Sequence, residues 1–112
     1  MLDLDFEIRD IVYGLNSLGL STNFSCQGNH DGGRIGIAYI SFSEGVKLPS
    51  VLIDYIHTQN WQIEREYTDP RNRRGVIYSI HSVDPDFPED LVELEKRNSA
   101  FIDGWKDYLH RA

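Results

Sequence analysis

The chain has 112 residues, of which 40% are hydrophobic and 12% aromatic, and its formal net charge is −7. This length and composition predict one folded domain over residues 1–112 and exclude a disordered chain. The negative charge argues against broad nucleic-acid binding, which needs an extended basic surface, and no apolar run is long enough to span a bilayer.

The single cysteine excludes an intrachain disulfide. The acidic first residues, MLDLDFEIRD, lack the basic and apolar regions of a signal peptide. We therefore expect a cytoplasmic protein.

The first half of the chain predicts two helices and two strands. Apolar residues at three- and four-residue spacing indicate a helix over 3–18, which ends at Gly19 in a left-handed cap. Strands are expected at about 21–26 and 35–42. A second helix is expected at about 48–58.

A β-hairpin follows, formed by WQIEREYT at 61–68 and GVIYSIHSV at 75–83. Alternation places mainly apolar residues on one face of these strands. The other face carries Glu64, Glu66 and His81.

The last helix is predicted over about 88–110, with Pro88 in its first turn. Its apolar residues have near-heptad spacing, and Asn98 fills the one missing position; the apolar members are Leu91, Leu94, Phe101, Trp105 and Tyr108. This stripe fits a helix packed on the sheet, which we favour. It also fits a homodimer seam in which Asn98 sets the register.

The element order α-β-β-α-β-β-α predicts an α+β fold, a two-layer sandwich with the helices on one face of a four-stranded, largely antiparallel sheet. The uncovered face, beside the two hairpin loops, is where we expect a site.

The loop SCQGNHDGGR at 25–34 is the first candidate for a site. Asp31-Gly32 alone would form a tight turn, so the additional glycines leave backbone amides that can bind an anion. The expected ligand contacts are Ser25, Cys26, Gln27, Gly28, His30 and Arg34.

Cys26 and His81 are the candidates for catalysis, because a nearby cation or base can ionise a thiol. The alternative is a cysteine packed as a small apolar side chain before a plain turn. No second pair of metal ligands accompanies Cys26, so we expect no zinc site.

A second loop, DPRNRRG at 69–75, holds Arg71, Arg73 and Arg74. Their guanidinium groups can bind phosphates or carboxylates in a forked geometry. Alternatively, they form exposed ion pairs with surface acids and contribute little.

The segment STNFSCQG resembles the Thr-x-x-Ser-Cys-x-Gly signature of the tRNA wybutosine-synthesis methyltransferase family at Thr22, Ser25, Cys26 and Gly28. It also resembles Ser-Cys-Gln-Gly segments of small uncharacterised bacterial and phage proteins. The first resemblance implies S-adenosylmethionine as cofactor and a guanosine-derived base in tRNA as substrate. Where that family continues with arginine, this chain has Asn29.

The leading hypothesis is a small cytoplasmic binding domain, encoded by a bacterium or a phage, for an anionic or nucleotide-like ligand or a partner protein. The two loops would form the rims of its site. The alternative is an enzyme that uses the Ser-Cys-Gln-Gly loop, either an RNA-base methyltransferase or a thiol-dependent enzyme. A third hypothesis is a protein inhibitor that works through its acidic helices.

Overall fold

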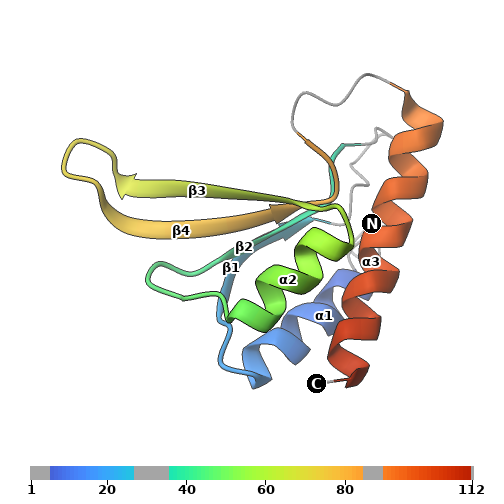
Figure 1. The fold of residues 1–112 in the computed structure, drawn as a ribbon, viewed down its shortest axis with the longest axis horizontal. Helices are drawn as coiled ribbons and strands as arrows, with labels where there is room; N and C mark the ends of the chain where they lie inside the picture. The colour runs from blue at the N-terminus through green and yellow to red at the C-terminus, as the bar shows by residue number, and fades with distance from the viewer. Residues whose placement is uncertain (1–5, 27–35, 85–89, 112) are drawn as a thin grey trace.

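The computed structural model describes residues 6–26, 36–84 and 90–111, and within them three helices and four strands follow the predicted order (Figure 1). The elements are α1 (Phe6–Ser17), β1 (Thr22–Cys26), β2 (Tyr39–Phe42), α2 (Ser50–Thr58), β3 (Gln62–Asp69), β4 (Arg74–His81) and α3 (Leu91–Arg111). The predicted α+β class is confirmed. No helix in these ranges has the length and apolar character that a membrane crossing requires.

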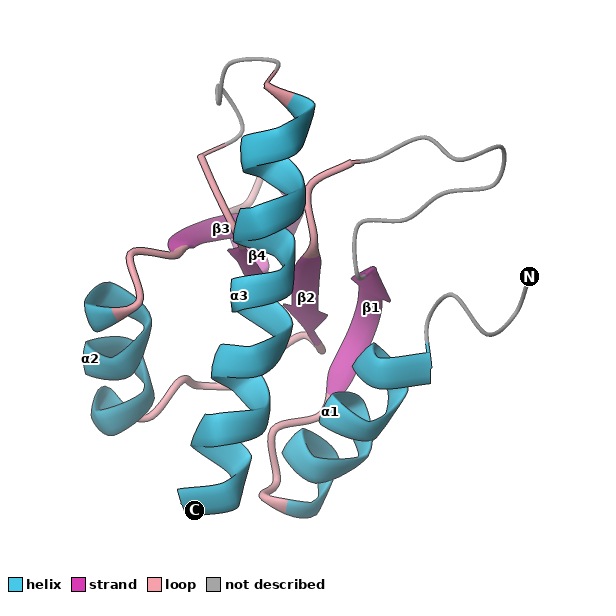
Figure 2. Cartoon of the chain, turned by 90° about the vertical axis from the view of Figure 1, so that its right-hand side faces the viewer, coloured by secondary structure: helices cyan, strands magenta, loops and turns pink. Residues whose placement is uncertain are grey.

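The four strands form one sheet in the order β1-β2-β4-β3, and each neighbouring pair is antiparallel. The three helices lie on one side of this sheet (Figure 2). β1 has five residues and β2 has four, whereas β3 and β4 have eight each. The β3–β4 hairpin therefore extends beyond the rest of the sheet and beyond the helices (Figure 1).

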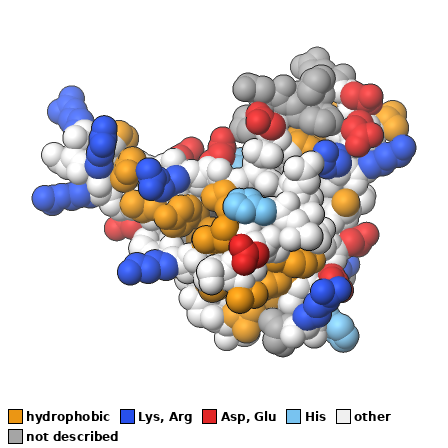
Figure 3. Space-filling view, in the orientation of Figure 1, with side chains coloured by type: hydrophobic (Ala, Val, Ile, Leu, Met, Phe, Trp, Pro, Cys, Tyr) orange, Lys and Arg blue, Asp and Glu red, His pale blue; other side chains and the backbone are white. Residues whose placement is uncertain are grey.

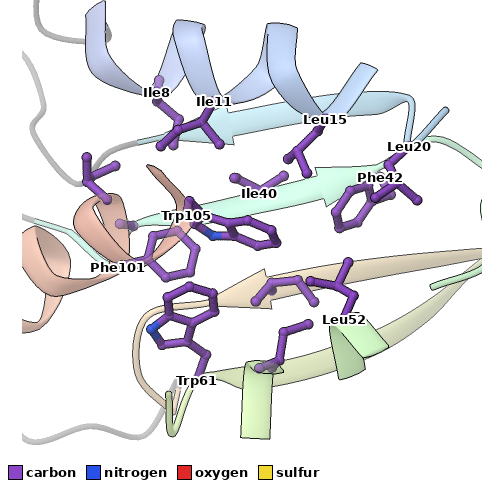
Figure 4. Packing of buried hydrophobic residues seen from close by; sticks show 14 residues of the cluster. Ile8, Ile11, Leu15, Leu20, Ile40, Phe42, Leu52, Trp61, Phe101 and Trp105 are labelled. Carbon is purple, nitrogen blue, oxygen red and sulfur yellow. The ribbon is translucent and has the colours of Figure 1, made fainter. Parts of the chain in front are cut away.

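The core lies between the helices and the sheet (Figure 4). At its centre the Trp61 ring packs on Phe101 and Trp105, with centroid separations of 4.8 and 5.1 Å. Phe101 and Trp105 are fully buried, and Leu94 is 8% exposed. The middle of the apolar stripe of α3 therefore packs within the chain, as favoured, whereas Leu91 at its start is 56% exposed.

Asn98 joins two segments of the fold to α3 through three hydrogen bonds. Its Oδ1 accepts hydrogen bonds from the Ala38 amide at 3.0 Å and the Ser82 hydroxyl at 2.7 Å. Its Nδ2 donates to the Gly36 carbonyl at 2.7 Å. The buried asparagine thus ties the segment before β2 to the segment after β4, a structural role in place of the register role in a dimer.

The predicted end of α1 agrees with the structure, whereas the predicted start of α3 is a few residues too early. α1 ends as expected, because Gly19 has φ +82° and the Leu20 amide donates to the Leu15 carbonyl at 2.9 Å. α3 begins later than predicted, at Leu91, where the Asp90 side chain accepts from the Glu93 amide at 3.1 Å. Pro88, expected in the first turn, lies outside the described residues.

Candidate functional site

The β3–β4 hairpin forms an arm that carries three exposed arginines at its tip (Figures 1 and 3). Arg71, Arg73 and Arg74 lie in or beside the turn that joins the strands. No described residue forms an ion pair or a hydrogen bond with their guanidinium groups. The alternative that these arginines pair with surface acids is therefore not realised among the described residues.

The turn itself places an arginine in a backbone conformation that arginine disfavours. Asp69 and Arg74 are register partners, and the Asn72 Nδ2 donates to the Asp69 Oδ2 at 2.9 Å. Arg73 has φ +51°, in the left-handed region that glycine and asparagine adopt most easily. A charged side chain thus stands where the local backbone favours glycine.

The loop after β2 holds the arm near its tip. The Gly45 amide donates to the Val76 carbonyl at 3.1 Å, and the Thr68 hydroxyl donates to the Glu44 Oε1 at 2.8 Å. Gly75 has φ +72°, and a Cβ at this position would collide with both of those side chains. Glycine is therefore required here for the loop after β2 to pack against the arm.

The two faces of the arm differ in charge. On the helix side, Arg65 is the register partner of Tyr78, and Tyr67 is the partner of Val76. The Arg65 guanidinium lies over the Tyr67 ring, 5.7 Å from its centroid. The opposite face carries Glu64 and Glu66, whose register partners are Ser79 and Ile77.

A groove of about 410 Å³ lies where the arm meets the loop after β2. Apolar, aromatic and charged residues line it: Glu44, Gly45, Val46, Lys47, Gly75, Val76 and Tyr78. In the view of Figure 3, hydrophobic side chains continue from the arm toward the body, with basic side chains around them. The groove therefore adjoins the basic and aromatic face of the arm.

The uncovered face of the sheet holds a polar cluster around His81. The His81 Nε2 lies 3.1 Å from the Glu64 Oε2, and the His81 ring stacks on Tyr39 with centroids 5.6 Å apart. Beside them the Ser79 hydroxyl donates to the Ser41 hydroxyl at 3.0 Å. Ser41 is only 7% exposed, so part of the face predicted to be open is covered.

Cys26 lies at the end of β1, opposite Tyr39, which is in turn opposite His81. The register thus brings the two catalytic candidates into one row of the sheet, with one strand between them. Ser25 is half-buried and is the register partner of the fully buried Ile40. The other members of the predicted loop site lie outside the described residues, and they are Gln27, Gly28, His30 and Arg34.

The arginine turn and Cys26 lie at opposite ends of the sheet. Cys26 is in the row that contains Gln62, the first residue of β3, whereas the arginine turn follows Asp69, its last. Seven residue steps along a strand span about 24 Å. The expectation that Arg71, Arg73 and Arg74 share a site with Cys26 is therefore not met by the described residues, because β1 and β4 run in the same direction. Cys26 ends β1, whereas the arginine turn precedes β4.

A second pocket of about 370 Å³ lies between α2 and the end of α3. Its lining consists of Val51, Asp54, Tyr55, Thr58, Tyr108 and Arg111. Burial raises the pKa of Tyr55, and the charge of Asp107 raises it further; burial also raises the pKa of Tyr108. The Tyr55 hydroxyl donates to the Gly104 carbonyl at 2.7 Å, which is a structural role.

The described part of the chain brings together no group of three or more histidine, cysteine or acidic residues that could hold a metal ion. Comparisons with protein-family models, with curated proteins and with solved structures give no significant match.

Sequence reasoning named the arginines of the tip but missed Arg65 as part of the same site. Alternation placed Arg65 and Tyr67 on the face that carries Trp61 and Ile63, which the helices cover. The helices end before this part of the hairpin, so its apolar-patterned face is left exposed (Figure 1). A charged residue on an otherwise apolar face was the available signal.

Proposed function

We propose that the chain is a binding domain that recognises an anionic partner through the arginine-tipped arm, in the cytoplasm. The observation that carries this proposal is the group of exposed guanidiniums that no described residue pairs. An unpaired arginine fork is suited to phosphate or carboxylate oxygens, which accept two parallel hydrogen bonds.

The charge distribution supports the same proposal. The segment 65–76 contains four arginines and two acidic residues, although the chain as a whole has a net charge of −7. A local basic arm on an acidic body concentrates attraction at one place and repels anions elsewhere. Such a surface favours a small anionic footprint over a long one.

The direct test is a titration of the purified chain with fluorescein-labelled inorganic polyphosphate at several salt concentrations. Binding should weaken steeply with salt, with a slope that corresponds to about three or four neutralised phosphates. Binding that is independent of salt, or the absence of binding at low salt, would contradict the proposal.

Arg73→Gly should separate the stability of the turn from its function. Removing the side chain relieves the left-handed conformation, so we expect the free energy of unfolding in urea to rise by about 1 kcal/mol. The same change should weaken polyphosphate binding severalfold, because one cation is lost. Arg73→Lys is the matched control: it keeps both the charge and the backbone conformation, so the unfolding free energy should stay the same. A loss of stability in Arg73→Gly would show that this side chain has a structural role.

A thiol-dependent enzyme is the second candidate function, favoured by the row that contains Cys26, Tyr39 and His81. A histidine that is oriented by a carboxylate such as Glu64 is the usual partner of a reactive thiol. The methyltransferase alternative rests on the four matching residues of the loop and would require S-adenosylmethionine.

The thiol candidate predicts rapid alkylation of Cys26 by iodoacetamide at neutral pH, slowed in His81→Asn. An alkylation rate equal to that of free cysteine in both proteins would rule out an activated thiol. Isothermal titration calorimetry with S-adenosylmethionine at about millimolar concentration tests the methyltransferase alternative, which requires a heat of binding.

A further inference from the structure

Two tyrosines lie on the same side of the arm as Arg65. Tyr67 and Tyr78 are half-buried, and they occupy diagonal register positions, since Tyr67 is opposite Val76 and Tyr78 is opposite Arg65. Diagonal neighbours on a sheet face are within reach of aromatic side chains. The arm thus combines aromatic rings and guanidinium groups on one face.

We propose that the anionic partner of the arm is single-stranded nucleic acid, an inference that rests on the proposed function. The phosphates bind Arg71, Arg73 and Arg74 at the tip. The bases stack on the Arg65 guanidinium and on the Tyr67 ring that it overlies. Stacking on aromatic rings next to a basic track is how proteins bind single strands without reading a sequence.

The groove beside the arm matches this partner. Its volume of about 410 Å³ is in the range of pockets that hold small organic groups. Tyr78 and Val76 provide apolar groups, and Lys47 adds a cation to the lining. Glu44 adds a carboxylate, which already accepts a hydrogen bond from the Thr68 hydroxyl. A base can enter such a groove while its phosphate stays near Lys47.

The charge pattern argues against the two competing partners. A duplex would require a broad basic surface, but Glu64 and Glu66 occupy the opposite face of the arm, and the body is acidic. An acidic peptide would use the guanidinium groups but would leave the aromatic rings without a contact. A single strand uses both sets of groups.

The test compares four fluorescein-labelled probes on the full chain: an oligouridylate of about ten nucleotides, an abasic strand of equal length, a polyglutamate peptide and a duplex. The oligouridylate should bind about tenfold more tightly than the abasic strand, since stacking adds to the phosphate contacts. Tyr67→Leu should remove this tenfold difference and leave the affinity for the abasic strand unchanged. Tyr67→Phe, which keeps the aromatic ring, should retain the difference, and equal urea midpoints should show that both variants are folded.

The experiment distinguishes a failure of the single-strand proposal from a failure of the proposed polyanion binding. Equal affinity for oligouridylate and abasic strand, with no effect of Tyr67→Leu, would overturn base stacking but leave polyanion binding intact. Tighter binding of polyglutamate or of the duplex would likewise overturn the assignment to single strands. No binding of any probe, at low salt, would overturn the proposed function as well.

Discussion

Replacing Arg71, Arg73 and Arg74 together with alanine is expected to weaken polyphosphate binding on the order of a hundredfold. Each basic residue near an anionic surface contributes about 1 kcal/mol, and the three guanidiniums lie close together at the exposed tip. The salt dependence should fall in parallel, because about three fewer counterions are released. Fluorescence anisotropy at several salt concentrations measures both quantities.

The matched control removes the same number of positive charges from α3. Lys96, Lys106 and Arg111 are exposed and lie on the helix, outside the arm, so their joint replacement by alanine should change the affinity by a few fold at most. A comparable loss in both triple variants would mean that net charge alone governs binding. In that case the arm would have no special role.

Asn98→Ala is expected to lower the free energy of unfolding by about 3 kcal/mol, the largest effect of a single substitution on stability that we predict. The change removes the Oδ1 acceptor that the Ala38 amide and the Ser82 hydroxyl share, and it leaves the Gly36 carbonyl without its donor. An unsatisfied buried polar group costs about 1–3 kcal/mol. Chemical denaturation monitored by tryptophan fluorescence measures this loss.

Two variants complete the test of Asn98. Ser82→Ala breaks only one of the three hydrogen bonds, so it should cost about 1 kcal/mol, and its combination with Asn98→Ala should be less than additive. Ser99→Ala, on an exposed position of the same helix, should change the stability by less than about 0.5 kcal/mol. If Asn98→Ala were as mild as Ser99→Ala, the buried network would not hold the sheet to α3.

The fold was predictable because short-range patterns determine it. The alternation in 61–68 and 75–83 indicates a hairpin, and the three- and four-residue spacing indicates helices wherever an apolar stripe meets the core. Gly19 ends α1 for a local reason, its left-handed backbone conformation. These signals depend on neighbouring residues only.

The position of the candidate site was less predictable because it depends on strand lengths and order. The sequence does not show that β2 has four residues whereas β4 has eight, which makes the arm project. It also does not show that β2 pairs antiparallel with β4, which puts the arginine turn and the end of β1 at opposite ends of the sheet. Without this pairing, sequence reasoning placed the two loops at one site. The Asn98 network was also beyond prediction, since Asn98 binds Gly36 and Ala38, which lie about 60 positions before it in the sequence.

The most direct test of the arm as the binding surface is nuclear magnetic resonance of the ¹⁵N-labelled chain during titration with polyphosphate. We predict that the amide shifts of residues 65–76 move progressively, together with those of Lys47 and its neighbours in the groove. Shifts confined to the row of Cys26, Tyr39 and His81, with the arm unchanged, would contradict the account and transfer the site to the other end of the sheet.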